Sequence, residues 1–143
     1  MALNANILIR PMTVEDYPQV HELWSSVKGL HLSENDSRSN ISRYLLRNPG
    51  LSLVALDGQK LCGIILCGHD GRWGILRHLA VDNAYRQRGI GRNLVDGCLS
   101  NLKAAGYTSA VALVTTGNDQ ALRFWIANGW KQYNSFPLGK DIL

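Results

Sequence analysis

Residues 85–97 have the sequence YRQRGIGRNLVDG, and the elements predicted on either side of this stretch determine the expected fold. Three arginines surround Gly89 and Gly91, and apolar residues at helical spacing begin at once. The first turn of a helix has backbone N–H groups without partners and a partial positive charge. Glycine lets a ligand approach the backbone, and arginine binds phosphate. The stretch predicts either a phosphate-binding helix N-terminus or a plain glycine turn with a solvated basic face.

Downstream of this stretch, apolar residues recur every three or four positions up to Leu102 and predict an amphipathic helix that ends before Gly106. The run SAVALVT at 109–115 is rich in β-branched residues and predicts a strand. Asn118 or Asp119 then caps another helix, and residues 130–140 are typical of a last strand or hairpin.

Upstream of it, the apolar run ILRHLAV at 75–81 predicts a strand. Residues 51–68 predict two further strands joined around Asp57 and Gly58. Closer to the N-terminus we expect a short strand at 7–9, a helix capped by Thr13 or Asp16, and a weaker helix within 37–47. This order predicts one α/β domain over residues 1–143, with mixed strand pairing and about four helices.

Length and composition favour a soluble protein of one domain. The chain has 143 residues, of which 45% are hydrophobic and 18% charged. It has no apolar run near the length of about 20 residues that spans a bilayer, and its N-terminus does not read as a secretory signal. The three cysteines include no CxxC pair, which argues against disulfides and a zinc site. We therefore expect a cytoplasmic protein without a membrane partner or a bound metal.

The net charge of +4 favours an anionic partner. Nucleic acid is disfavoured, because the chain has no run of five or more Lys and Arg and no groove-reading signature. A P-loop would need Lys and Ser or Thr after Gly91, where Arg92 and Asn93 stand. A dinucleotide fingerprint would need glycine at position 94, which is Leu94.

Two motifs resemble those of the GNAT superfamily, the acetyl-CoA-dependent N-acyltransferases. RQRGIG at 86–91 is similar to the family's R/Q-x-x-G-x-G/A motif and stands between a strand and a long helix. NDQALRFW at 118–125, followed by Gly129 and Trp130, is similar to its N-x-x-A-x-x-F-Y-x-x-x-G-F pattern. The expected order of elements fits over essentially the whole chain. Two motifs at the right spacing are far more specific than one.

The resemblance implies a mostly antiparallel sheet in which two neighbouring parallel strands splay apart around acetyl-CoA. The pantetheine arm would bond to the backbone of the first strand, and backbone N–H groups of the RQRGIGR stretch would hold the pyrophosphate. Leu79 and Val81 also fit plain core packing. The cofactor-binding residues implied are Leu79, Ala80, Val81, Arg86, Gln87, Arg88, Gly89, Ile90, Gly91, Arg92, Asn118 and Trp125.

This sequence departs from the family at the positions of the catalytic acid and the catalytic base. Many members have a glutamate base where this chain has Ile75, and a tyrosine acid where it has Trp125. An indole N–H only donates hydrogen bonds and cannot act as a general acid. Trp125 could contact the thioester sulfur or simply pack in the core.

His78 has a side chain whose pKa suits a base. Strand alternation, however, predicts that Arg77, Leu79 and Val81 share one face and that His78 and Ala80 share the other, away from the acceptor. Arg77 could bind a substrate carboxylate, or it could be an ordinary surface arginine.

Residues 29–40, GLHLSENDSRSN, correspond to the segment that lines the acceptor site in this family. His31, Glu34 and Asp36 are candidates there for a base or for amine recognition, although an ordinary capped polar loop explains each of them as well. The catalytic candidates are thus Trp125, His78 and Glu34, and the substrate-binding candidates are Arg77 and His31.

The resemblance predicts an N-acetyltransferase in which a primary amine attacks acetyl-CoA directly in a ternary complex. The acceptor would be a small metabolite, an amino-acid-like amine or a protein amine. The alternative is a non-catalytic acyl-CoA-binding module in which Ile75 and Trp125 mark lost chemistry; acetyl transfer to an amine separates the two. The sheet edges and the segment FPLGKDIL at 136–143 are compatible with a monomer or a homodimer.

Overall fold

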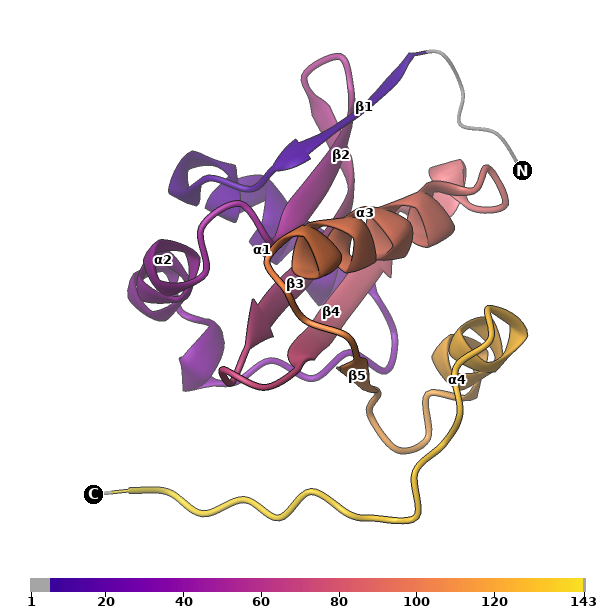
Figure 1. The fold of residues 1–143 in the computed structure, drawn as a ribbon. Coiled ribbons are helices and arrows are strands. Elements are labelled where there is room, and N and C mark those ends of the chain that lie inside the picture. The colour runs from indigo at the N-terminus through magenta and orange to yellow at the C-terminus, as the bar shows by residue number, and fades with distance from the viewer. Residues whose placement is uncertain (1–5, 143) are drawn as a thin grey trace.

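The computed structural model describes residues 6–142 and contains a five-stranded sheet with helices on both faces (Figure 1). The strands are β1 Ile7–Pro11, β2 Leu53–Asp57, β3 Lys60–His69, β4 Gly74–Val81 and β5 Ala110–Leu113. The α-helices are α1 Tyr17–Ser26, α2 Arg38–Arg47, α3 Ile90–Ala104 and α4 Asp119–Ala127. Short 3-10 helices occupy Val14–Asp16, Glu34–Asp36 and Asn83–Tyr85.

The strands lie in the order β1-β2-β3-β4-β5. All neighbours are antiparallel except β4 and β5, which run parallel and are connected through α3. The predicted hairpin between β2 and β3 is present, with Gly58 at a φ of +60° in its turn. The mixed α/β fold with its parallel strand pair is confirmed.

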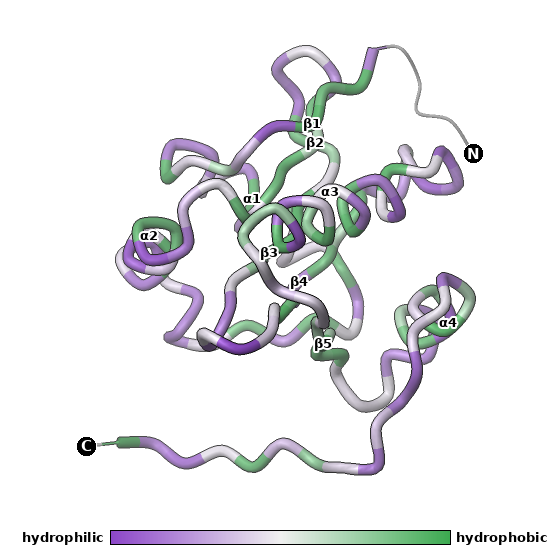
Figure 2. Tube along the Cα trace, in the orientation of Figure 1, coloured by the Kyte–Doolittle hydropathy of each residue, from purple (hydrophilic) through white to green (hydrophobic). Residues whose placement is uncertain are grey.

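The sheet is buried on both faces, which explains the long apolar run of β3. On one face α3 packs with Leu94 and Cys98. On the other face α1 and α2 pack with Trp24 and Ile41. Figure 2 shows the hydrophobic residues concentrated in the central strands and on the inner sides of the helices.

The three cysteines lie inside the fold. Cys62, Cys67 and Cys98 are buried and free. None of the helices in residues 6–142 is long and apolar enough to cross a membrane.

A short turn that contains both predicted cap residues, Thr13 and Asp16, precedes helix α1. Thr13 and Asp16 form a capping box around the 3-10 helix Val14–Asp16, and Asp16 is the residue before α1. Asp16 accepts two hydrogen bonds of 2.8 Å from the Arg10 guanidinium. Both predicted cap residues therefore form the capping box of the short turn; Asp16 stands at the N-cap position of α1 but makes no side-chain cap hydrogen bond to that helix.

Strand β4 contains a bulge that the sequence did not predict. Leu66 of β3 pairs with Arg77, whereas Ile64 pairs with Ala80, so Ile65 lies opposite two residues, His78 and Leu79. His78 has a φ of +58°, a conformation that is rare outside glycine. A bulge of this kind inserts one extra residue and re-aims the side chains around it.

The predicted alternation along β4 is therefore wrong for Arg77, which does not share a face with Leu79 and Val81, and holds for the other residues named. Arg77 lies opposite Leu66, and Ala80 opposite Ile64, on the face covered by α1 and α2. Leu79 and Val81 pack on the face covered by α3. His78 joins the α1 face through contacts with Trp24, because the bulge absorbs one step of the alternation.

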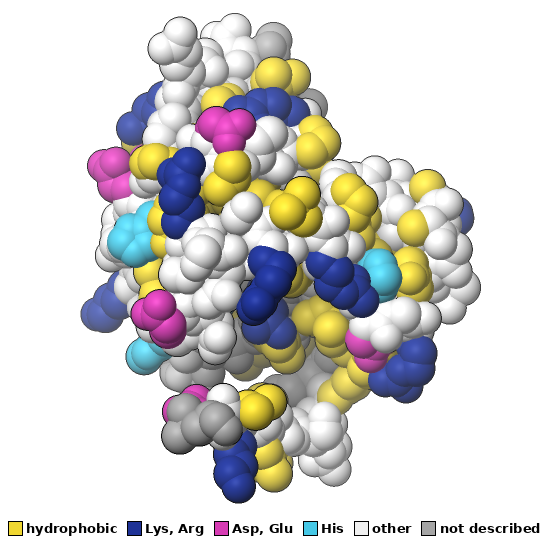
Figure 3. Space-filling view, turned by 90° about the vertical axis from the view of Figure 1, so that its left-hand side faces the viewer, with side chains coloured by type: hydrophobic (Ala, Val, Ile, Leu, Met, Phe, Trp, Pro, Cys, Tyr) yellow, Lys and Arg dark blue, Asp and Glu magenta, His cyan; other side chains and the backbone are white. Residues whose placement is uncertain are grey.

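The last strand or hairpin predicted for residues 130–140 is absent. After α4 the chain runs without strand pairing through the last described residue, and beyond Tyr133 it stands clear of the body (Figures 1 and 3). β5 is also shorter than the predicted run at 109–115. Residues 130–140, and the residues of 109–115 outside β5, therefore form no strand in the described structure despite their β propensity.

Candidate active site

The strands β4 and β5 separate in the middle of β4. Their parallel ladder ends at the pair Arg77 and Leu113, but β4 continues to Val81. Beyond Leu113 the chain turns away towards α4 (Figure 1). On this side the backbone of residues 78–81 has no strand partner in the part of the chain that the structure describes. The divergence leaves an opening between the two strands.

A small cavity of about 40 Å³ lies at this divergence. Four elements converge on it: the loop after α1, the bulge of β4, the end of β5 and the first turns of α4. Its lining residues are Gly29, Leu30, His78, Leu79, Leu113, Val114, Thr115, Asn118, Ala121 and Trp125.

His78 is held at this cavity from its backbone and its ring. Its carbonyl oxygen accepts a 3.0 Å hydrogen bond from Nε1 of the buried Trp24. Its imidazole contacts the Trp24 ring edge to face, with centroids 5.2 Å apart. Its Nε2 lies 2.9 Å from Oδ1 of Asp36. These contacts stabilise the strained backbone of the bulge.

Asp36 is itself fixed before it meets His78. Its Oδ2 accepts the Ser33 N–H at 3.0 Å, and its carbonyl oxygen accepts the Tyr17 hydroxyl at 2.7 Å. Because a carboxylate only accepts hydrogen bonds, it selects the His78 tautomer with the proton on Nε2. The other ring nitrogen, Nδ1, then has a free lone pair and no hydrogen-bond partner among residues 6–142.

Two opposing influences set the pKa of His78. Burial lowers this pKa below its ordinary value and outweighs the charge and hydrogen bond of Asp36, which raise it; Arg77 lowers it slightly further. The net shift favours the neutral imidazole, which is the form that can accept a proton.

Trp125 and Asn118 form the α4 side of the cavity. Trp125 is 5% exposed and contacts Trp130 edge to face at 4.8 Å. Asn118 caps α4 by accepting the Ala121 N–H at 3.2 Å. Gly29 has a φ of +88°, and a Cβ there would lie 3.1 Å from the Asn118 side chain. The loop after α1 therefore approaches α4 as closely as it does because Gly29 has no side chain.

The N-terminus of α3 has the geometry of an anion-binding turn. Gln87 and Gly89 have positive φ values of 62° and 79°, and Gly89 precedes the helix without a side-chain cap. The backbone N–H groups of this first turn have no intrahelical partner. Consecutive N–H groups in such a conformation form a concave site for anions.

The arginines beside this turn are differently engaged. Arg88 lies over the Tyr85 ring, 4.9 Å from its centroid. Arg86 donates to the Val81 carbonyl at 3.4 Å, which connects the turn to the end of β4. Arg92 is exposed and lies 3.9 Å from Asp96.

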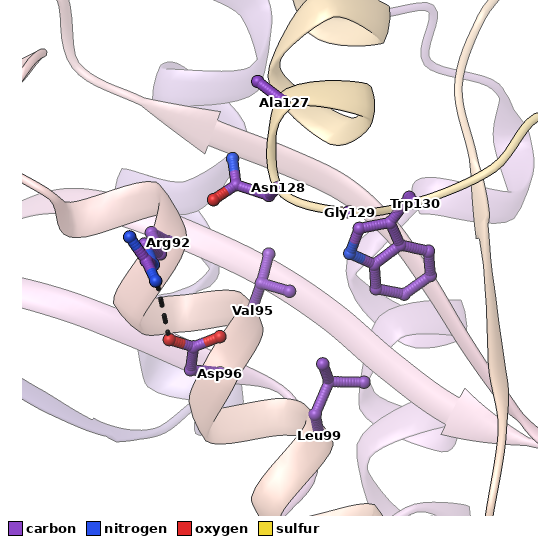
Figure 4. A pocket seen from close by; sticks show the side chains of 8 residues that line it. All are labelled: Arg92, Val95, Asp96, Leu99, Ala127, Asn128, Gly129 and Trp130. Atoms are coloured by element: carbon purple, nitrogen blue, oxygen red, sulfur yellow. Dashed lines mark ion pairs between the residues drawn. The ribbon is translucent and has the colours of Figure 1, made fainter.

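A larger cavity of about 340 Å³ lies between α3 and the end of α4. Figure 4 shows side chains of α3 on one side of it, and on the other side the last residue of α4, Ala127, with the residues that follow. Its lining residues are Arg92, Val95, Asp96, Leu99, Ala127, Asn128, Gly129 and Trp130.

Some sequence candidates lie outside both cavities. His31 and Glu34 are exposed and line neither of them. Arg77 lies on the face of the sheet that α1 and α2 cover and does not line the small cavity. Of the polar residues in the loop after α1, Asp36 is the one that the fold brings to His78.

Comparison with known proteins agrees with this geometry. The profile of the acetyltransferase (GNAT) family matches residues 17–130. The chain belongs to the GNAT acetyltransferase family. An acetyltransferase of Sodalis glossinidius is 32% identical over 136 residues, and one of Yersinia pestis is 28% identical over 135. Both alignments cover 94% of this chain and 95% of the relative.

Solved GNAT structures share the fold at low sequence identity. The PaiA N-acetyltransferase of Thermoplasma acidophilum, solved with coenzyme A, has a TM-score of 0.80 at 20% identity and covers 91% of this chain and 92% of its own. The aminoglycoside acetyltransferase AAC(6')-Iy, solved with a bisubstrate analogue, has a TM-score of 0.75 at 15% identity and covers 97% and 100%. These likenesses establish the fold, and the family establishes an acyltransferase.

Proposed function

We propose that this GNAT protein is an N-acetyltransferase that transfers the acetyl group of acetyl-CoA to a primary amine within a ternary complex. The observation that carries the proposal is the position of His78, whose ring is oriented by Asp36, at the cavity where β4 and β5 separate. A binding module without chemistry has no need of a strained bulge and a fixed imidazole tautomer at this position.

The residues present fit coenzyme A. The turn before α3 offers unpaired N–H groups and positive charge for a pyrophosphate, and glycines there leave the backbone accessible. The backbone of Leu79 to Val81 is open towards β5 and can bond an extended amide-bearing chain. The Thermoplasma PaiA enzyme, which shares the fold, was solved in complex with coenzyme A, and this supports coenzyme A as the ligand. When bound, acetyl-CoA supplies an activated thioester.

His78 is the base in this proposal. An amine must lose a proton to be a nucleophile, and the free lone pair of His78 Nδ1 accepts it while Nε2–H remains bonded to Asp36. Asp36 then stabilises the imidazolium, as the acidic member of a catalytic triad does. Backbone N–H groups at the end of β4 polarise the acetyl carbonyl.

Trp125 packs beside the reacting groups and excludes water; it does not donate a proton. No dedicated acid is needed, because a thiol has a pKa of about 8.5 and leaves readily as the thiolate.

The proposal is tested by calorimetric titration with acetyl-CoA beside 3′-dephospho-CoA and NAD. Clearly favoured binding of acetyl-CoA is expected. A panel of small amines, amino acids and N-terminal peptides then follows, with release of free thiol as the readout of transfer. Binding without thiol release from any amine would identify a binding module, and no binding at moderate salt would restrict the likeness to the fold.

A further inference from the structure

Arg77 is a half-buried cation that pairs with nothing in the described part of the chain. Its guanidinium makes no hydrogen bond, ion pair or ring contact with residues 6–142. Arg38 and Arg123 make none either, but both are exposed, so water solvates their charge. The remaining arginines each contact a carboxylate, an amide or carbonyl oxygen, or an aromatic ring. Because a charge withdrawn from water is costly without a partner, Arg77 indicates a binding site for an anionic group.

The bulge of β4 places Arg77 and His78 on the same face of the sheet. In a regular strand, consecutive side chains point to opposite faces. Here Arg77 lies opposite Leu66 on the face covered by α1 and α2, and His78 contacts Trp24 of α1 on that face as well. Burial is the main cause of the lowered pKa of His78, and the nearby Arg77 charge lowers it further. The proposed base and the unpaired cation are therefore neighbours.

A hydroxyl group of α2 lies on the same face near Arg77. Tyr44 reaches the sheet above Gly68, where a Cβ would lie 2.6 Å from the Tyr44 hydroxyl oxygen. Gly68 pairs with Ile75, which shares its face of β4 with Arg77. Burial raises the pKa of Tyr44 to about 12, and the Arg77 charge opposes this rise. The phenol thus keeps its proton at neutral pH, and its O–H makes no hydrogen bond within residues 6–142.

The face that carries Arg77 is open beside β5. Arg77 pairs with Leu113, the last residue of β5. Ala112 packs under α3, so the next side chain, that of Leu113, points to the face of Arg77. Leu113 is 44% exposed there. A small molecule can therefore reach Arg77 and His78 from this side.

The cofactor does not account for this cation. The N-terminus of α3 is the proposed pyrophosphate site, and α3 packs on the other face of the sheet from Arg77. The turn before α3 also follows the far end of β4, after Val81. The anionic group that Arg77 binds therefore belongs to the second substrate, whose amine must reach His78.

We propose that Arg77 and the Tyr44 hydroxyl bind a carboxylate of the acceptor, and that the acceptor is a small amino-acid-like molecule. This inference rests on the proposed function, because it names the acceptor class of the same site. A guanidinium and a hydroxyl both donate hydrogen bonds to a carboxylate. Arg77 and His78 are consecutive residues, with Cα atoms about 3.8 Å apart, so the carboxylate lies only a few bonds from the amine. Amines that carry only positive charges are repelled by Arg77.

The test compares amino acids with their amides as acceptors. Each pair has the same amine and differs in the carboxylate, and release of free thiol from acetyl-CoA measures transfer to either. For the amino acids that the wild-type protein acetylates, kcat/KM should exceed that of the amide by about ten- to a hundredfold, the scale of hydrogen bonds to a charged group. Amides or spermidine accepted as well as the amino acids would overturn the proposal.

Variants of the two side chains assign the preference to this site. Arg77→Gln should raise KM for the amino acid and remove the preference, while KM for the amide and the affinity for acetyl-CoA stay unchanged. Tyr44→Phe removes one donor and should raise KM for the amino acid by less. Arg38→Gln is the matched control, because it removes one positive charge from an exposed, unpaired arginine of α2. An unchanged KM in Arg77→Gln would make Arg77 an ordinary surface arginine.

A binding measurement separates this inference from the proposed function. The protein is titrated calorimetrically with the same amino acids and amides in the presence of coenzyme A, where no transfer occurs. Binding of amino acids that is lost in Arg77→Gln, without thiol release from any amine, would keep the carboxylate site and overturn the transferase. Transfer to amides and amino acids alike would keep the transferase and overturn the carboxylate site. Neither binding nor transfer would overturn both.

Discussion

His78 Nε2 lies 2.9 Å from Asp36 Oδ1, although 42 positions separate the two residues in the sequence. The contact joins the bulge of β4 to the 3-10 helix between α1 and α2. Both side chains are largely buried, at 19% and 12% exposed. The proposed base is therefore oriented by a residue from the segment between α1 and α2.

The first prediction concerns His78 as the base. His78→Gln keeps a side chain that can bond to Asp36 but removes the titratable nitrogen. We expect kcat for acetyl transfer to fall by about a hundredfold or more, the scale of general base catalysis, while acetyl-CoA affinity is unchanged. His31→Gln is the control, because His31 is exposed and lines neither cavity. A kcat within about threefold of wild type would exclude His78 as the base.

The second prediction concerns the titration of His78. Burial lowers its pKa, so its imidazole should titrate below the ordinary value of about 6.5. Asp36 raises that pKa, hence Asp36→Asn should move the titration to still lower pH. Both are measured by NMR on the imidazole C–H signals, assigned by their loss in His78→Gln. A signal that titrates at or above 6.5, or does not move in Asp36→Asn, contradicts the described environment.

The third prediction places coenzyme A at the N-terminus of α3. Gly89→Glu introduces bulk and negative charge at the turn and should abolish acetyl-CoA binding in a calorimetric titration. Gly106→Glu is the control, because both glycines have a positive φ, 79° and 98°, and share the backbone strain of the substitution. Gly106 ends α3 at its other terminus. Equal affinity for acetyl-CoA in both folded variants would show that the cofactor does not bind at this turn.

The elements of this fold could be predicted from the sequence because local signals determine them. Apolar spacing from Ile90 to Leu102 predicts α3, and Asp57 with Gly58 predicts the hairpin. The glycine turn before α3 was predicted for the same reason, since Gly89 needs only its neighbours to adopt its conformation.

The arrangement around His78 could not be predicted, because it depends on contacts between distant segments. No glycine in β4 indicates the bulge. It is stabilised by Trp24 and Asp36, which come from other elements. A period-2 pattern assumes an unbroken strand, and one inserted residue reverses it. The close approach of Gly29 to Asn118 could not be predicted from the sequence either. The glycine just after α1 was its one local sign.

The fourth prediction concerns stability and pH at the start of α1. Burial alone would raise the pKa of Asp16, but hydrogen bonds from Arg10 and Thr13 lower it below its unfolded value of about 3.9. Its stabilisation is therefore full above that pH and is lost as the pH falls further. Asp16→Asn should lower the free energy of unfolding at pH 7 by about 1 to 2 kcal/mol, the scale of hydrogen bonds to a charged group with a partly exposed partner.

Urea denaturation at several pH values measures this effect. The difference between Asp16→Asn and wild type should shrink below about pH 4. Glu15→Gln removes the same charge from an exposed neighbour and should change the stability little. A difference that is independent of pH would mean that Asp16 acts through shape and not through its charge.

The last prediction concerns Trp125, which stands where many family members have a tyrosine acid. Its side chain is 5% exposed and contacts both Phe124 and Trp130 edge to face. Trp125→Phe keeps an aromatic ring at this position and removes the indole N–H together with part of the ring volume. Because the indole cannot release a proton at useful pH, we expect thiol release to continue with a loss in kcat of less than about a hundredfold. Trp125→Ala should instead destabilise the fold by about 3 to 5 kcal/mol. A larger loss of kcat in a stable Trp125→Phe variant would show that the N–H contacts the reacting sulfur and acts as a catalytic donor.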